Sequence, residues 1–246
     1  MTHALAHDQL DDVHDPVLVA RSVVKSYGST PALRGATLAV GRGEILAITG
    51  ASGSGKSTLL LCLAGVLRPD AGDVTLDGRV ISAESEAKRS ALRRSTFGVL
   101  FQFGQLVPEL TAQENVALPL LLSGVARRPA LAAASSWLER FGVLEQAGVR
   151  PPEMSGGQSQ RVAVARAMVT EPTVLFADEP SGALDTVSGD RVMAELVRVS
   201  REAGTTVLLV THDSRVAAHG DREVVFRDGL PLHVPALPSP ARVVRP

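Results

Sequence analysis

The sequence predicts an α/β fold in which a mainly parallel sheet carries helices on both faces. Short apolar runs alternate along the chain with longer segments of helical pattern. This alternation is typical of parallel strands joined by crossover helices. Near the middle of the chain, at about residues 103–160, the pattern becomes mainly helical, which predicts an inserted helical subdomain.

The strands are predicted from apolar and β-branched runs, taken in chain order. The first two lie at residues 17–24 and 36–40. Residues 44–49 form an apolar run that ends in a glycine, as a buried strand does when it enters a loop. The later strands are expected at residues 74–76, 98–101, 173–177, 206–210 and 223–226.

The helices are predicted from apolar residues that recur at helical spacing. A long helical stretch at residues 111–141 is interrupted by Gly124 and Pro129. The other helices are expected at residues 56–66, 158–169 and 187–203.

One folded domain is expected at residues 17–229, between two segments without regular structure. Residues 1–16 are polar and lack a hydrophobic period, so they are predicted to form a flexible lead. Residues 230–246 are rich in proline and are predicted to be a disordered tail.

Composition excludes several classes of protein. The formal net charge of the 246 residues is −1, so no general basic field favours nucleic acid as a partner. The single cysteine, Cys62, excludes an internal disulfide and fits a reducing compartment. No apolar run approaches the roughly 18 to 20 residues of a membrane span. The chain is therefore expected to be cytoplasmic, and any membrane role would come through a partner.

A glycine-rich loop after the third predicted strand is the strongest chemical signal. The stretch from Gly50 to Ser57 fits the pattern G-x-x-x-x-G-K-[ST] and opens a predicted helix. Its glycines let backbone N–H groups and the helix dipole point at phosphate oxygens. Lys56 is expected to reach the β- and γ-phosphates, and Ser57 to hold Mg²⁺. The expected nucleotide contacts are Gly50, Ser52, Gly53, Ser54, Gly55, Lys56, Ser57 and Thr58.

Two carboxylates follow the predicted strand at residues 173–177. Asp178 and Glu179 lie where that strand ends, and ligands bind at the carboxyl ends of parallel strands. Asp178 is predicted to hold Mg²⁺, and Glu179 to polarise an attacking water. The glycine-rich loop and this pair predict a nucleoside triphosphatase, with kinases, GTPases and motors still open.

Further motifs resemble those of the ABC ATPases, over residues 17–229. Ser155-Gly156-Gly157-Gln158 is similar to the signature motif of that family, LSGGQ, and lies ahead of the acidic pair as it does there. Met154 replaces the usual leucine, and Ser159 stands where a second glutamine is common. The resemblance extends to the Q-loop, the D-loop, the switch histidine and the adenine-stacking aromatic, at Gln102, Asp185, His212 and Tyr27 respectively.

This resemblance implies a P-loop NTPase core of the ABC ATPase type, with an antiparallel β-subdomain near the N-terminus. It implies a head-to-tail dimer that encloses two ATP molecules, in which each signature motif binds the γ-phosphate held by the partner. Gln102 would contact Mg²⁺ or the attacking water, and His212 would hold the γ-phosphate. Tyr27 would stack on adenine, and Asp185 would lie at the shared site.

Residues 101–120 indicate the type of ABC system. They resemble the macrolide-export and lipoprotein-release branch of the family (MacB, LolD and FtsE type). That branch implies an exporter or force-transmitting system whose integral membrane permease is a separate chain. The subunit would then lie on the inner face of the membrane, with residues 103–110 near the permease. An amino-acid-type importer ATPase and a cell-division-type ABC ATPase without transport remain as alternatives.

Overall fold

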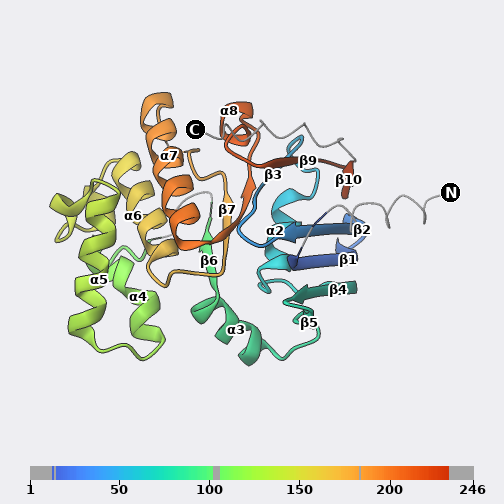
Figure 1. The fold of residues 1–246 in the computed structure, drawn as a ribbon, viewed down its shortest axis with the longest axis horizontal. Helices are drawn as coiled ribbons and strands as arrows, with labels where there is room; N and C mark the ends of the chain where they lie inside the picture. The colour runs from blue at the N-terminus through green and yellow to red at the C-terminus, as the bar shows by residue number, and fades with distance from the viewer. Residues whose placement is uncertain (1–12, 14, 102–105, 183, 233–246) are drawn as a thin grey trace, which may run out of the picture.

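The computed structural model describes residues 13, 15–101, 106–182 and 184–232, and within these ranges a six-stranded sheet forms the centre (Figure 1). Its strand order is β10-β9-β3-β8-β7-β6. The strands are β3 (Ile45–Thr49), β6 (Phe97–Leu100), β7 (Val174–Asp178), β8 (Thr206–Val210), β9 (Arg222–Arg227) and β10 (Leu230–Leu232). All neighbours pair in parallel except β10, which pairs antiparallel with β9. The predicted, mainly parallel sheet is therefore confirmed.

A second, antiparallel sheet of order β2-β1-β4-β5 lies beside the first. Its long strands β1 (Pro16–Tyr27) and β2 (Thr30–Gly41) are joined by a short turn, and β4 (Ala71–Leu76) turns directly into β5 (Arg79–Val80). This is the antiparallel subdomain that the family resemblance implied.

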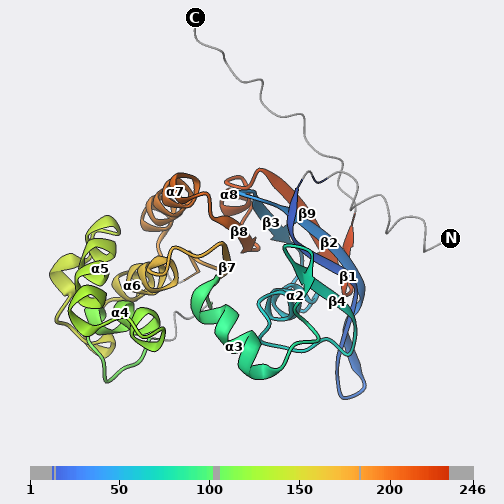
Figure 2. The same cartoon turned by 60° about the horizontal axis from the view of Figure 1, so that its bottom comes forward.

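Helices cover the central sheet and form a separate lobe. The helix that follows the glycine-rich loop is α2 (Lys56–Leu63), and α3 (Glu86–Ser95) lies between the antiparallel sheet and the lobe (Figure 2). The others are α4 (Ala112–Leu122), α5 (Arg127–Arg140), α6 (Gly156–Met168), α7 (Thr186–Ala203) and α8 (Ser214–Ala217). Helices α4 and α5 form the body of the lobe and pack on α6. None of the described helices is long and apolar enough to cross a membrane.

The central sheet is buried on both faces because alternate side chains enter two different cores. In β7, Leu175 and Ala177 pack with the helices of the lobe and with α7. Val174 and Phe176 pack on the opposite side, with α2 and the antiparallel sheet. A strand buried on both faces reads as a continuous apolar run, which is why these strands were recognisable in the sequence.

The structure corrects the predicted limits of the domain at both ends. Pro16 begins β1, so it is not part of a flexible lead. Leu230–Leu232 was predicted to be disordered but forms β10, because a turn through residues 228–229 returns the chain alongside β9. Pro231 is tolerated there because β10 is an edge strand. Residues 1–12, 14 and 233–246 lie outside the described part of the chain.

The helical stretch at residues 111–141 is interrupted only once. Helix α4 ends before Gly124, whose φ of 86° favours glycine, and α5 begins at Arg127. Pro129 does not interrupt a helix, because it lies in the first turn of α5, where its missing N–H costs no hydrogen bond.

Candidate active site

The glycine-rich loop between β3 and α2 is held in close contact with the strands around it. Gly50 and Gly55 have positive φ angles of 140° and 104°. A Cβ at Gly50 would lie 2.1 Å from the carbonyl oxygen of Phe226, and one at Gly55 would lie 2.4 Å from that of Ala32. Both positions therefore require glycine, for conformation and for space. Gly53, with a φ of 76°, has open space around it.

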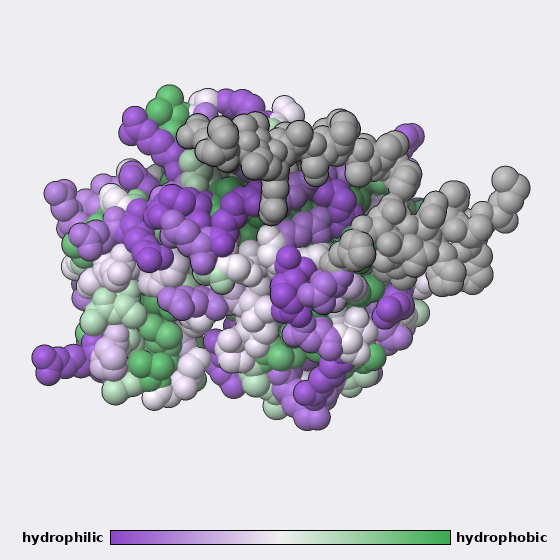
Figure 3. All heavy atoms as spheres, in the orientation of Figure 1, coloured by the Kyte–Doolittle hydropathy of each residue, from purple (hydrophilic) through white to green (hydrophobic). Residues whose placement is uncertain are grey.

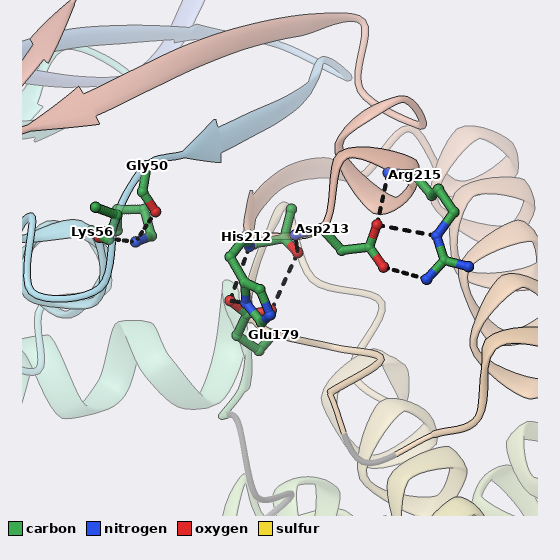
Figure 4. A network of polar contacts seen from close by, with 8 residues as sticks. Gly50, Lys56, Glu179, His212, Asp213 and Arg215 are labelled. Atoms are coloured by element: carbon green, nitrogen blue, oxygen red, sulfur yellow. Dashed lines mark hydrogen bonds and ion pairs between the residues drawn. The ribbon is translucent and has the colours of Figure 1, made fainter.

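The loop presents several donors suited to an anion. Lys56 is only 8% exposed, and its Nζ donates to the carbonyl oxygens of Gly50 and Ala51 at 2.8 and 2.9 Å (Figure 4). Helix α2 begins at Lys56 without a side-chain cap, so its first N–H groups are available to a ligand. The hydroxyl of Ser54 is buried and has no hydrogen-bond partner among the described residues. These features fit a phosphate group.

Two neighbouring oxygen groups lie where β7 ends beside α2. Burial raises the pKa of Asp178, and a hydrogen bond with the Ser57 side chain opposes that rise. Both side chains line the same cleft. A hydroxyl and a carboxylate are oxygen ligands of the kind that Mg²⁺ prefers, so this pair fits that ion.

Glu179 is held by residues that follow β8. Its Oε1 accepts a hydrogen bond from the backbone N–H of His212 at 3.1 Å and lies 2.5 Å from His212 Nδ1 (Figure 4). Its Oε2 accepts from the hydroxyl of Thr211 at 3.2 Å. The φ of Glu179 is 48°, a left-handed conformation that is costly for a residue other than glycine. Such strain is typical of functional sites.

The histidine of this pair is much more open to solvent than the carboxylate. The side chain of His212 is 74% exposed and that of Glu179 only 12%. The hydrogen bond with Glu179, together with the negative charge of that carboxylate, raises the pKa of His212. The imidazole therefore lies on the solvent side of the pair and the carboxylate on the buried side.

One cleft of about 440 Å³ brings most of the predicted site residues together. Gly50 lines an adjoining hollow with Ala51 and Phe226. Ala32 and Val210 also line the cleft, although no motif marked them in the sequence. The predicted residues that line it are Ser52, Gly53, Ser54, Gly55, Lys56, Ser57, Thr58, Asp178, Glu179 and His212.

The residues similar to the signature motif, Ser155 to Gln158, lie at the N-terminus of α6 and do not line this cleft. They form a capping box: the Ser155 hydroxyl accepts from the N–H of Gln158 at 3.2 Å, and the Gln158 side chain accepts from the N–H of Ser155 at 2.9 Å. Ser155 and Gly156 are exposed, and Gly157 is partly buried. The N-terminus of α6 is therefore capped by residues of the same chain, and its first residues are exposed to solvent.

Two other predicted residues, Asp185 and Tyr27, do not line the cleft, and a third lies outside the described residues. Asp185 caps the N-terminus of α7, where its side chain accepts from the N–H of Ser188 at 3.0 Å. Tyr27 ends β1 and is 51% exposed, as a stacking role requires. Gln102 lies outside the described residues.

Two polar residues in contact with the site were missed in the sequence. Thr211 directly follows β8 and touches Glu179, and a hydroxyl at the end of a buried strand was the available signal. Gln160 in α6 is 2% exposed and donates to the carbonyl oxygen of Pro180 at 2.6 Å. A glutamine within an apolar helix face gives no comparable signal.

Comparisons with known proteins show the family of the chain. The family model described as ABC transporter matches residues 33–182. The lipoprotein-releasing system ATP-binding protein LolD of Porphyromonas gingivalis is 43% identical over 214 residues, which cover 87% of this chain and 98% of the relative. LolD 2 of Caulobacter vibrioides is 44% identical, covering 87% and 96%.

Relatives of other kinds are also similar. The macrolide export ATP-binding/permease protein MacB 1/2 of Paracoccus denitrificans is 44% identical over 87% of this chain, which spans 32% of that longer protein. A dimeric, post-hydrolysis structure of the ATP-binding cassette MJ0796 bound to ADP and Pi is 35% identical, with a TM-score of 0.83 and coverage of 88% of this chain and 97% of that one. The chain therefore belongs to the ABC transporter family and is an ATPase of that family.

Proposed function

We propose that the chain powers a separate membrane permease of the lipoprotein-release or macrolide-export type, by hydrolysing Mg·ATP in the cleft beside α2. The observation that carries this proposal is the convergence of Lys56, Asp178, Glu179 and His212 in one cleft. The relatives named for lipoprotein release support the type of permease, since this chain covers nearly all of their length. In this proposal the subunit lies on the inner face of the membrane through the permease.

The loop residues bind and orient the triphosphate. The N–H groups of the loop and of the first turn of α2 donate to phosphate oxygens. The ammonium of Lys56, which contacts two loop carbonyls, exchanges them for the β- and γ-phosphates. Tyr27 stacks on the adenine, because its exposed ring offers a flat apolar face.

Three residues are assigned to Mg²⁺: Ser57, Asp178 and Gln102. Once bound, the ion supplies positive charge to the β- and γ-phosphate oxygens. Burial raises the pKa of Asp178 because it disfavours the charged carboxylate. A bound cation would stabilise that charge.

Glu179 and His212 act on the water and on the γ-phosphate. The Glu179 carboxylate accepts a hydrogen bond from the attacking water and orients it for in-line attack. His212 turns its exposed imidazole from Glu179 to the γ-phosphate. Lys56 stabilises the charge that develops in the transition state.

The signature residues serve the nucleotide of a second copy. The N-terminus of α6 combines a positive dipole end with exposed residues, which suits a γ-phosphate brought by the partner. Asp185, the N-cap of α7, is assigned to the same shared site. The dimeric structures of similar cassettes support this head-to-tail arrangement.

The permease contact is assigned to an apolar groove between α3, α4 and β6. The groove has a volume of about 430 Å³, and Leu122 at its edge is 63% exposed. Figure 3 shows a notch on this side, between the lobe and the rest of the molecule. Residues 103–110 were expected near the permease, and residues 103–105 lie outside the described part of the chain. The groove is lined in part by Val66, Val99, Phe101, Leu118, Pro119 and Leu122.

The test compares the purified wild-type protein with Glu179→Gln. The variant is expected to bind ATP, to lose at least about a hundredfold in turnover because water is no longer polarised, and to accumulate a closed dimer with ATP. Light scattering measures the dimer, and phosphate release measures turnover. Normal turnover in the variant would contradict the role of Glu179, and a monomer with ATP bound would contradict the head-to-tail dimer of isolated subunits.

A further inference from the structure

Thr211 is a buried residue that joins three parts of the site. It directly follows β8, and its side chain and backbone have no exposed surface. Its backbone N–H donates to the carbonyl oxygen of Ile48 in β3, at 3.1 Å. Strand β3 leads directly into the phosphate-binding loop, so the position of Thr211 is fixed relative to that loop.

The hydrogen-bond roles of the Thr211 hydroxyl follow from its neighbours. The backbone N–H of Asp213 donates to Thr211 Oγ1 at 3.1 Å. An ionised carboxylate only accepts, so the hydroxyl proton is donated to Glu179 Oε2, at 3.2 Å. One oxygen atom therefore connects the carboxylate to the loop that carries His212.

The two side chains that contact the Glu179 carboxylate differ in their exposure to solvent. One of its oxygens faces His212, whose side chain is largely exposed and has room to turn. The other faces Thr211, which is fully buried. When the His212 side chain turns to the γ-phosphate, the Thr211 hydroxyl remains on Oε2 and the backbone N–H of His212 remains on Oε1.

We infer that Thr211 is a positioning residue for ATP hydrolysis, whose hydroxyl holds the Glu179 carboxylate in the orientation that activates water. This inference rests on the proposed role of Glu179. It assigns Thr211 no contact with the nucleotide, so the residue acts on the rate of the chemical step and not on ATP affinity.

The experiment uses the matched variants Thr211→Val and Thr211→Ser in the full chain. Valine has nearly the shape of threonine but lacks the hydroxyl, whereas serine keeps it. We expect Thr211→Val to lower kcat by about tenfold to a hundredfold, the range for a hydrogen bond to a charged group. KM for ATP and the affinity for a fluorescent ATP analogue should stay within about threefold of the wild type, and Thr211→Ser should stay within about threefold in kcat.

A double variant tests whether the Thr211 hydroxyl acts through the Glu179 carboxylate or through the loop that carries His212. If Thr211 acts through Glu179, adding Thr211→Val to Glu179→Gln should leave the residual single-turnover rate unchanged. A further fall in that double variant would overturn the inference, because the hydroxyl would then act through Asp213 alone. So would equal losses in the valine and serine variants, or a loss of ATP affinity that matches the loss of kcat.

The inference and the proposed function fail in different ways. If Glu179→Gln loses turnover while Thr211→Val keeps the wild-type kcat, the positioning role is wrong and the proposed function stands. If Glu179→Gln turns over ATP normally, Glu179 is not the catalytic carboxylate, and the role of Thr211 fails with it. Thermal unfolding followed by circular dichroism checks that each variant is folded.

Discussion

The pairing of His212 with Glu179 in the cleft depends on pH, because His212 is charged only when it is protonated. The hydrogen bond and the charge of Glu179 raise the pKa of His212 above the ordinary value of 6.5, and Asp213 adds to this while burial and Lys56 oppose it. A raised pKa means that the folded state binds the proton more tightly than the unfolded state. The stability that the pair contributes is therefore complete below about pH 6.5 and is lost as the pH rises through the raised value.

The titration of His212 can be measured directly. In the nucleotide-free protein, the imidazole resonances of His212 in NMR spectra should titrate with a midpoint above 6.5. In Glu179→Gln the midpoint should move down, because the amide keeps a hydrogen-bonding group but removes the charge. The spectrum of His212→Ala assigns the resonance. Equal midpoints in the wild type and in Glu179→Gln would show that the two side chains are not paired in solution.

The site residues that could be predicted from the sequence are those whose chemistry follows from local context. Lys56, Asp178 and Glu179 adjoin a buried strand or open a helix, so their meeting at one sheet edge follows from the parallel topology. Thr211 could not be assigned in this way, because its role depends on which side chain faces it across two strands. The left-handed backbone of Glu179 was equally hidden, because no local sequence signal marks a positive φ at a glutamate.

Among the elements, those with a clear hydrophobic period could be predicted and those without one could not. Helix α3 was missed because half of its residues are charged, and the one buried residue in it is Arg89. The helix is stabilised instead by the Ser85 cap and by ion pairs of Glu86 with Arg89 and Arg93. Strand β5 is only two residues long, and its pairing with β4 depends on the turn at residues 77–78.

A buried hydrogen bond joins helix α6 to the segment that follows β7. Gln160 Nε2 donates to the carbonyl oxygen of Pro180, directly after the acidic pair. We expect Gln160→Met to destabilise the protein by about 1 to 3 kcal/mol, because the buried carbonyl loses its donor. Urea unfolding followed by circular dichroism measures this.

Gln160→Glu is the matched comparison for that bond. It keeps the shape of the side chain but sets an acceptor against the carbonyl oxygen, so it should destabilise the protein more than methionine does. If neither variant changes the unfolding midpoint, the bond between α6 and the end of β7 contributes nothing to stability. A fall in ATPase rate with Gln160→Met at temperatures where it is folded would further show that α6 and the acidic pair are coupled.

In the whole molecule, the cleft and the signature residues of one chain lie apart. Lys56 lines the cleft, whereas Ser155 is exposed at the start of α6. The dimeric structures of similar cassettes therefore support a site that takes the two from different copies. This arrangement makes the subunit incomplete alone, so its ATPase activity should rise more steeply than in proportion to protein concentration.

Mixing two defective chains tests whether the sites are shared. One chain carries Lys56→Ala, and the other carries Ser155→Arg, both in the Glu179→Gln background that prevents hydrolysis. Each pair of identical chains has two defective composite sites. A mixed pair has one site with both defects and one intact site, formed by the loop of the second chain and the signature of the first.

ATP should therefore drive association in the mixture and not in either chain alone, measured by energy transfer between dyes attached to the two N-termini. Glu179→Gln without further change is the positive control, and the mixture without ATP is the negative control. If the Ser155→Arg chain associates with ATP as readily as the control, the signature does not bind the partner's nucleotide. If association appears in the mixture alone, each copy completes the site of the other, because an intact loop and an intact signature are then present only on different chains.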